Sequence, residues 1–431
     1  MKRALWLSAL IAVGAAAAAR EGESPAAQRE AASGSAIASA SRQGKSYSNT
    51  PAELIPYRRL VRPYKEFFVQ PQEFLGVGRE LPEPKVSSVK IGFLGPLEGS
   101  AEAIFGQHML AGVHLAIEAA NAAGGYHGHP FELEVHADKA RWGDSSNELV
   151  AMYFREQVWG VVGTLSSANA HVMMRATLKM NLPIVNTATT DPTLNEHRIP
   201  FGVRCMADDR QFSYALARHL FEERELKWVA MIRVNNRDGR TGVREFVDAA
   251  RRLGHPLLFE VRFDEGETDF AAQLARIKQS PAQAVVVWGN PREAGLIVKQ
   301  MRGLGMKQAV VGWFRMVSPE FLKLAGAAAE GVVCAYPYDP TAKDPLLLDF
   351  QRRYQQRFSE APDAFAAHAY DGTGLLIAAI QKAGLNRIKI RDALAEFKSF
   401  HGATGEIVFD ATHNDIGPVY LAKVVGGQFR F

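Results

Sequence analysis

Cysteine is almost absent from this chain of 431 residues. Only Cys205 and Cys334 occur, so no CxxC pair can serve redox chemistry or hold a metal. Each follows a short apolar segment, 201–204 or 331–333. In an oxidising compartment the two thiols can form a disulfide, and otherwise they are two small buried thiols. The sequence leaves both alternatives open, because it does not fix the distance between them.

The common catalytic motifs are also missing. The chain contains no GxSxG, GxxxxGKS/T or HExxH, and no GxGxxG follows a predicted strand. His127 and His129 have no third ligand nearby, so a tight turn explains them better than a metal site. Asp208 and Asp209 precede a predicted helix, where acidic residues act as caps and favour the helix dipole. We therefore expect no enzymatic activity, no cofactor and no metal.

A large excess of charge of one sign is lacking as well. Lys and Arg number 50 and Asp and Glu number 46, which gives a formal net charge of +4. The basic residues are spread along the chain, so nucleic acid is not an expected partner.

Long apolar runs are lacking except at the start. Lys2 and Arg3 precede about 16 mostly apolar residues, Ala4–Ala19, fewer than the roughly 20 that span a bilayer. This pattern predicts a signal peptide over residues 1–19, cleaved near Ala19, and the alternative is a membrane anchor. No cysteine lies near this site, which excludes a lipid anchor there. We expect an exported, soluble mature protein in the periplasm.

Two further N-terminal segments differ in composition. Residues 20–50 are rich in Ala, Ser, Gly and Gln without periodicity, which predicts a disordered linker. Residues 51–87 mix aromatic and basic residues with several prolines, which predicts an extended N-terminal arm. This arm either packs on its own protein or docks a partner.

Short apolar segments alternate with amphipathic helical segments from residue 88 onward. In the first unit, Lys90–Leu94 predicts a strand, Gly95–Gly106 a glycine-rich loop, and 105–122 a helix with one apolar stripe. Strands are predicted at 89–94, 131–136, 159–163, 183–186, 200–205, 228–234, 257–263, 284–288, 309–312 and 331–336. Such βαβ units build parallel sheets.

The two series of units predict two doubly wound, Rossmann-like α/β lobes joined by crossing hinge strands, with a cleft between them. Lobe 1 comprises 88–205 plus 336–405, and lobe 2 comprises 206–335 plus 406–431. Near the end, helices are predicted at 344–358, 363–383 and 388–396, followed by a strand pair at 405–410 and 418–424.

Three loops of the first series lie at the same edge of the predicted sheet: 95–106, 164–169 and 186–190. The second loop carries Ser166 and Ser167, and the third carries Thr189 and Thr190. Hydroxyl groups and the free N–H groups of a helix start can bind an anion such as a carboxylate. Alternatively, these residues are helix caps and turn formers. Their occurrence at two neighbouring strand ends favours binding.

With these loops the chain resembles the type I periplasmic solute-binding proteins, in the branch that serves branched-chain amino-acid (Leu/Ile/Val) ABC transporters. The resemblance covers about 89–431 and rests on the order and spacing of motifs that are weak individually. They are IGFLGPLEGS, AGVHLAIEAANAAGGYHG, GVVGTLSSAN, VNTATTDPTL, YPYDPTAKDP and AAHAYDGTGLLIAAI. The resemblance implies that Ser167 and Thr190 hydrogen-bond the ligand carboxylate. It also implies that backbone groups of Leu165 and Ala188 hold the α-carboxylate and α-ammonium, and that Leu97–Ser100 lines the pocket.

The second lobe departs from the family's pattern. The family usually has an aromatic residue at Asp238, a tyrosine at Asn290, and often an acidic residue in the stretch Trp313–Arg315. A buried ammonium without an acidic partner is costly. Either Asp238 supplies the carboxylate, or the ligand has no ammonium and stacks on Trp313 or Phe314, with Arg315 adding charge. The plainer alternative is that Asp238 caps the following helix and Arg315 is solvated.

The resemblance implies the substrate-binding component of an ABC importer, which captures an amino acid or a related small carboxylate and delivers it to an inner-membrane permease. A soluble ligand-sensing receptor subunit is the alternative, and a monomer is expected. The expected ligand-binding residues are Leu97, Ser100, Leu165, Ser166, Ser167, Ala188, Thr189, Thr190, Asp238, Asn290, Trp313 and Phe314.

Overall fold

The computed structural model describes residues 70, 73–100, 102–138 and 143–431. The predicted signal peptide (1–19), the predicted linker (20–50) and most of the predicted arm lie outside the described residues. Among the described residues, no helix has the length and apolar composition that crossing a membrane requires.

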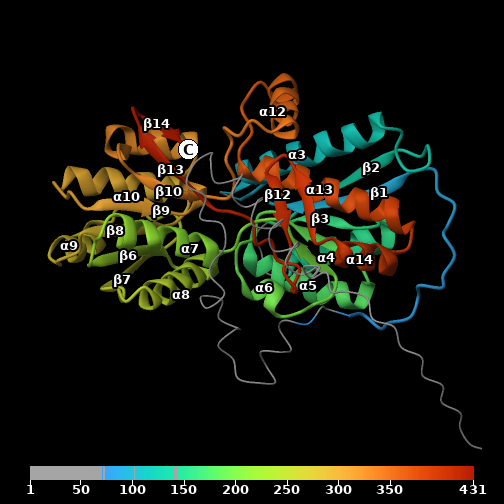
Figure 1. The fold of residues 1–431 in the computed structure, drawn as a ribbon, viewed down its shortest axis with the longest axis horizontal. Helices are drawn as coiled ribbons and strands as arrows, with labels where there is room; N and C mark the ends of the chain where they lie inside the picture. Colours follow the sequence, from blue (N-terminus) through green and yellow to red (C-terminus); the bar gives the residue numbers. More distant parts are fainter. Residues whose placement is uncertain (1–69, 71–72, 101, 139–142) are drawn as a thin grey trace, which may run out of the picture. The chain divides into compact units, whose positions relative to one another are not determined.

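The first sheet has five parallel strands in the order β2-β1-β3-β4-β5 (Figure 1). The strands are β1 (Val89–Gly95), β2 (Phe131–Ala137), β3 (Val161–Gly163), β4 (Ile184–Asn186) and β5 (Gly202–Arg204). Parallel neighbours need crossover connections, and the crossovers here include α3 (Ala103–Ala122), α4 (Asp144–Ala151), α5 (Ser167–Met180) and α6 (Thr193–Glu196). A π-helical turn, η3 (Met152–Glu156), extends α4. The strand order reverses between β1 and β3, which is the switch point where doubly wound sheets bind ligands.

The second sheet repeats this arrangement and adds two strands. Its order is β14-β13-β10-β9-β8-β6-β7, so the order reverses between β6 and β8. The parallel strands are β6 (Val229–Val234), β7 (Phe259–Phe263), β8 (Ala284–Trp288), β9 (Ala309–Gly312) and β10 (Val333–Tyr336). The antiparallel strands are β13 (Tyr420–Val425) and β14 (Gln428–Arg430). The helices along this part of the chain are α7 (Asp209–Arg218), α8 (Arg237–Arg252), α9 (Ala271–Lys278), α10 (Pro291–Gly303) and α11 (Pro319–Ala325), with the turns η4 (His219–Glu223), η5 (Phe314–Met316) and η6 (Gly326–Ala329).

Three helices near the C-terminus belong with the first sheet. They are α12 (Pro345–Phe358), α13 (Ala364–Ala383) and α14 (Arg387–Glu396). Figure 1 shows α13 beside α3, and their contact is close because Gly112 of α3 lies against the backbone of Ala366. The rings of Phe105 and Phe365 stack in the same interface, with centroids 4.5 Å apart.

One pairing predicted from the sequence is wrong. The segments 405–410 and 418–424 do not form a strand pair. Instead, β12 (Gly405–Val408) pairs with β11 (Ser399–Gly402) across a tight turn, whereas β13 pairs with β10 and β14. The tight turn brings β11 and β12 together. The chain between β12 and β13 folds back near Phe409 and Asp415 and bonds to Arg204 of β5.

The segments that connect the two sheets meet at Arg204, whose side chain is fully buried. Its guanidinium donates hydrogen bonds to the Asn414 side chain (2.6 Å), the Asp191 carbonyl (2.6 Å) and the Asp208 carboxylate (3.2 Å). Asp208 also begins α7 through a capping box with Gln211. The predicted capping role of Asp208 is therefore confirmed.

The described part of the N-terminal arm packs on its own protein. The rings of Phe74 and Phe201 pack edge to face with centroids 4.8 Å apart, and Arg79 Nε lies 2.6 Å from the Asp392 carboxylate.

The two cysteines do not form a disulfide in the structure. Cys205 and Cys334 are buried free thiols, which is the second of the two alternatives that the sequence left open.

We predict that Gly112→Ala destabilises the protein. A Cβ atom at this position would lie 2.1 Å from the Ala366 carbonyl oxygen, so α3 and α13 must separate, at a cost of about 1–3 kcal/mol. The measurement is urea unfolding followed by circular dichroism. Gly303→Ala in α10 is the control, because no atom lies within 4 Å of its added Cβ. Equal unfolding midpoints for the two variants would contradict the predicted α3–α13 packing.

Candidate ligand-binding site

The loops at the two switch points contain most of the predicted site residues. After β1 and β3 come Leu97–Ser100 and Leu165–Ser167, and after β6 and β8 come Asp238 and Asn290. These residues therefore follow the carboxyl ends of strands on either side of a switch point, which is where doubly wound sheets bind ligands.

Buried hydroxyl groups follow β3 and β4 in the first sheet. Ser167 is 1% exposed and Thr189 is fully buried. Neither hydroxyl has a hydrogen-bond partner within the part of the chain that the structure describes, and the same holds for Thr187 and the Asn186 amide. Buried polar groups without partners are unusual, so these side chains are available to a ligand. The Thr190 hydroxyl likewise has no hydrogen-bond partner in the described residues. The Thr190 carbonyl accepts the Asp209 N–H at 2.8 Å, and burial raises the pKa of the Asp209 carboxyl well above its ordinary value.

Two predicted contacts have local structural roles. Ser166 caps α5, since its hydroxyl accepts the Asn169 N–H at 3.4 Å. The Ser100 hydroxyl accepts the Glu102 N–H at 3.0 Å, just before α3 begins. For Ser166 the capping interpretation describes the structure, whereas Ser100 forms a local turn before α3. Leu97 is partly buried against the core, and Leu165 and Ala188 are fully buried.

Arg315, after β9, is the centre of a charged cluster. Its Nη1 donates to the Glu102 carboxylate (2.7 Å) and to the Asn290 side-chain oxygen (3.1 Å). Its Nη2 lies 3.3 Å from the Asp238 carboxylate and 3.5 Å from the Leu165 carbonyl oxygen. The side chain is 2% exposed, so the expectation of a solvated Arg315 is wrong. The Leu165 carbonyl, predicted to hold the ligand, is in contact with this arginine.

Asp238 does not cap its helix. Asn236 caps α8 by accepting the Gly239 N–H at 3.0 Å, which leaves the Asp238 carboxylate for Arg315. The capping alternative for Asp238 is therefore also wrong.

The aromatic residues Trp313 and Phe314 are engaged within the protein. The Trp313 indole N–H donates to the Gly289 carbonyl at 2.7 Å, and its ring stacks on Trp288 and lies 4.6 Å from the Arg315 guanidinium carbon. Phe314 stacks on Phe212 at 5.2 Å. Each residue is 1% exposed, so these rings support the site from within the core.

Glu102 is the site residue that the sequence did not reveal. It precedes α3 in a loop of small and polar residues, and the only available signal was an acidic residue at a helix start. Burial raises its pKa, Arg315 opposes that increase, and the nearby Asp238 adds to it.

A second charged contact joins loops of the two sheets. Arg237 of α8 donates through Nε to the Asp191 carboxylate at 2.7 Å, and His171 Nε2 lies 3.1 Å from the same carboxylate. Asp191 is fully buried. Burial alone would raise the pKa of Asp191, but the hydrogen bond with His171, the charge of Arg237 and the hydrogen bond from Thr193 together lower it below its ordinary value.

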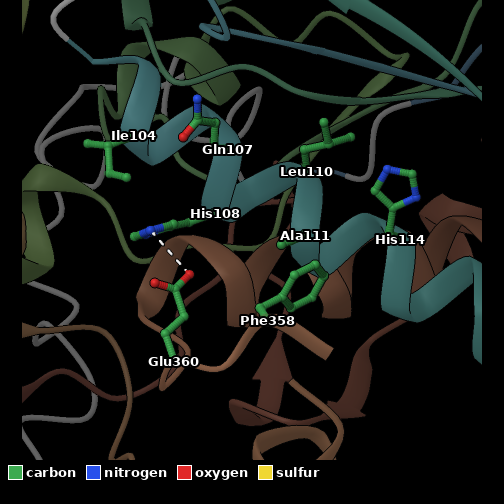
Figure 2. A pocket seen from close by; sticks show the side chains of 8 residues that line it. All are labelled: Ile104, Gln107, His108, Leu110, Ala111, His114, Phe358 and Glu360. Carbon is green, nitrogen blue, oxygen red and sulfur yellow. Dashed lines mark ion pairs between the residues drawn. The ribbon is translucent and has the colours of Figure 1, made fainter. Parts of the chain in front are cut away.

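A cavity of about 340 Å³ lies elsewhere, on α3 and the end of α12 (Figure 2). Its lining includes Ile104, His108 and Glu360, and none of the predicted site residues. His108 lies 2.7 Å from Asp363 and 3.7 Å from Glu360, so its ring is already engaged. Within the described ranges, no group of three or more His, Cys, Asp or Glu side chains is placed to hold a metal ion.

Comparison with known proteins agrees with this arrangement of two sheets. A model of the periplasmic binding protein family matches residues 88–428. The chain belongs to that family. The resemblance and the two-lobed α/β fold predicted from the sequence are therefore confirmed.

Three relatives of this periplasmic binding protein illustrate the range of sequence identities and ligands. The Leu/Ile/Val-binding protein homolog 2 of Brucella abortus (strain 2308) is 28% identical over 328 residues, which cover 75% of this chain and 87% of the relative. The branched-chain amino acid transporter substrate-binding protein LivJ from Streptococcus pneumoniae, solved with isoleucine, is 26% identical, with a TM-score of 0.74 and coverage of 80% and 98%. An ABC-transporter solute-binding protein from R. palustris, solved with benzoate, is 18% identical, with a TM-score of 0.72 and coverage of 80% and 95%, and it shows the fold alone.

We predict that Asp191→Asn destabilises this binding protein in a pH-dependent way. The substitution keeps the size of the side chain but weakens its bonds to charged partners, so the free energy of unfolding at pH 7 should fall by about 1.5–3 kcal/mol. Because folding lowers the pKa of Asp191 from its ordinary value of 3.8, the stabilisation is present above that pH. It is lost as the pH falls toward the lowered pKa.

The measurement is a series of urea unfolding curves between pH 7 and pH 3. The difference between wild type and Asp191→Asn should stay constant down to about pH 5 and narrow below about pH 4. Asp349→Asn, in an exposed ion pair with Arg352, is the control and should cost less than about 1 kcal/mol. A difference that widens in acid would be the wrong sign for this interaction.

Proposed function

We infer that this protein is the periplasmic substrate-binding component of an ABC importer. In this proposal it captures a small carboxylate between the strand-end loops of its two sheets and delivers it to a membrane permease. The observation that carries the proposal is the set of buried hydroxyls without protein partners, including Ser167 and Thr189, at the switch-point edge of the first sheet.

The physical chemistry of these loops suits a carboxylate. The first turn of α5 has N–H groups without intrahelical acceptors, and its dipole favours negative charge. Hydroxyl donors next to such a helix start can bind an anion without a cationic side chain. Thr190 and the backbone of Ala188 complete the proposed carboxylate site from the loop after β4.

The opposite wall of the proposed site comes from the second sheet. Asn290 and Arg315 bond to Glu102, and Arg315 also bonds to Asp238, so contacts across the two sheets already exist near the proposed ligand. Proteins of this architecture close on their ligands by hinge motion, and the connecting segments around Arg204 are the natural hinge.

Several finer features belong to the same proposal. Residues 1–19 act as a cleaved signal peptide, and no lipid anchor is attached there. The protein catalyses no reaction and binds no nucleic acid. It acts as a monomer, since a single chain supplies both walls of the proposed site.

The relatives leave the ligand class open. Isoleucine is the ligand named for LivJ, and benzoate is the ligand named for the R. palustris protein. Both ligands carry a carboxylate, and only isoleucine carries an ammonium group. The proposed carboxylate contacts therefore apply to either class.

We predict that Ser167→Ala and Thr190→Ala each weaken carboxylate binding by about 1–3 kcal/mol, roughly 5- to 150-fold in Kd, because each removes a buried hydrogen bond to the ligand. Isothermal titration calorimetry on refolded, ligand-free protein measures this, with leucine, isoleucine, valine, 4-methylpentanoate and benzoate as ligands. Thr341→Ala is the matched control, since its hydroxyl bonds to Asp339 in an exposed turn. Unchanged affinity in both site variants would refute the proposed carboxylate site.

A further inference from the structure

Asp191 connects the two lobes through the two oxygens of one buried carboxylate. Its Oδ1 accepts the Thr193 N–H at 2.9 Å and the Thr193 hydroxyl at 2.8 Å, both from the same lobe. Its Oδ2 lies 2.6 Å from Nη2 and 2.7 Å from Nε of Arg237, the first residue of α8 in the second lobe. Arg204 fixes the Asp191 backbone by donating to its carbonyl at 2.6 Å. Arg237 is therefore a cation that one lobe brings to a carboxylate held in the other.

Nε2 of His171 lies between this carboxylate and this guanidinium. It is 3.1 Å from Oδ2 of Asp191 and 2.9 Å from Nη2 of Arg237. A guanidinium can only donate, so the contact with Arg237 is favourable only when Nε2 carries no proton and accepts the hydrogen bond. The contact with Asp191 is favourable only when Nε2 carries a proton and donates a hydrogen bond. One ring nitrogen cannot do both, so the protonation of His171 selects between the two partners.

The protonation of His171 also decides what separation of the lobes costs. With a neutral ring, the counter-charge of Asp191 comes from Arg237 across the interface. Separation then leaves a buried carboxylate without a cation, which is costly. With a protonated ring, His171 supplies the counter-charge from the carboxylate's own lobe and repels the nearby guanidinium. Acid therefore lowers the cost of separating the lobes.

The other charged groups around His171 do not take over this role. Arg244 of α8 lies 3.9 Å from Oδ1 of Asp191, so it belongs to the same departing lobe, and it pairs more closely with Glu245 at 2.8 Å. Arg175, one turn along α5, keeps its charge throughout this pH range. The other acidic residues on α4, α6 and α8 are Asp144, which begins α4, Glu148, paired with His136, Glu196, paired with Arg210, and Asp238 and Asp248, paired with Arg315 and Arg252.

His197 is the second histidine beside this contact. Its ring centroid lies 4.9 Å from that of His171. Burial lowers the pKa of His197, and the charges of His171, Arg237 and Arg175 lower it further against the opposing charge of Asp191. Protonation of His197 therefore requires a lower pH than is ordinary for a histidine.

We propose that His171, Asp191 and Arg237 form a latch across the two lobes that retains the ligand while His171 is neutral and opens when His171 is protonated. The proposal rests on the proposed function, in which the lobes close on a carboxylate, and it adds a proton as the signal for release. Histidine is the side-chain type that ordinarily changes charge between about pH 5 and pH 8, which sets the pH range of the test.

The main test follows ligand affinity from pH 8 to pH 5 by isothermal titration calorimetry on the refolded full chain, with leucine and benzoate as probes. The Kd of wild type should increase by about 3- to 10-fold as the pH falls, within the limit of about tenfold per pH unit that coupling to one proton sets. In His171→Gln the amide oxygen can accept from Arg237 at every pH, so its Kd should change less with pH. The same pH dependence in both proteins would overturn the latch.

The comparison with His171→Gln is needed because other buried groups titrate in the same range. Burial raises the pKa of Asp371 to about 6 and that of Asp415 to about 7. Both carboxyls are present in the two proteins, so their effects cancel in the ratio of the Kd values. His129→Gln is the matched histidine control, since His129 is exposed, and it should keep the pH dependence of wild type.

Arg237→Gln removes the cation of the latch from the other lobe. Its Kd at pH 8 should be about 10-fold above that of wild type, as expected when a buried carboxylate loses a charged partner, and the difference should narrow as the pH falls. Arg240→Gln, an exposed arginine one turn along the same helix, should bind like wild type. An equal loss in Arg240→Gln would show that net charge sets the affinity and would overturn the latch. Circular dichroism checks the fold of each variant, and either His171→Gln or Arg237→Gln decides the question if the other does not fold.

The outcomes also separate this inference from the proposed function. Small-angle X-ray scattering on the ligand-free chain measures lobe opening directly: the radius of gyration of wild type should be larger at pH 5 than at pH 8, and that of His171→Gln should not. If leucine, isoleucine, valine, 4-methylpentanoate and benzoate all fail to bind, the proposed function fails, and the scattering comparison still decides the latch. If ligands bind but wild type and His171→Gln share one pH dependence, the latch is overturned and the carboxylate-binding function stands.

Discussion

The structure depends on one buried guanidinium, that of Arg204. It joins the segment after β5, the loop after β4 through the Asp191 carbonyl, and the late segment that contains Asn414. A buried charge is tolerated only when its hydrogen bonds are satisfied, so these segments must stay in register with one another. Because the Asp191 loop also carries Thr189 and Thr190, this interaction fixes the candidate carboxylate loop relative to the segments that connect the two sheets.

Two other charged contacts join loops of the two sheets. Asp191 meets Arg237, and Glu102 meets Arg315. Breaking such a pair is costly, because it leaves a buried charge without its partner, so each pair favours one arrangement of its loops. They also place polar chemistry on both sides of the proposed ligand.

The fold was largely predictable because apolar strands and amphipathic helices alternate with a regular period. The strands β1 and β8 lie where the sequence predicted them. Their residues are buried over all or nearly all of the strand, and such burial gives a strand an apolar sequence that is easy to recognise. The strand pair at 405–410 and 418–424 failed because β-propensity identifies strands but does not select their partners. The tight turn before Gly405 pairs β12 with β11, and the bonds to Arg204 hold the chain that follows.

For the candidate site, the sequence by itself determined which loops lie at the strand ends, because parallel strands end at a common edge. It thereby determined that Ser167, Thr189 and Thr190 share one region. Only the tertiary structure decided that Arg315 is buried and bonds to both Glu102 and Asp238, since these residues are far apart in the chain. Charge pairs of this kind depend on distances of a few ångströms between separate elements. Local sequence patterns carry no information about such distances.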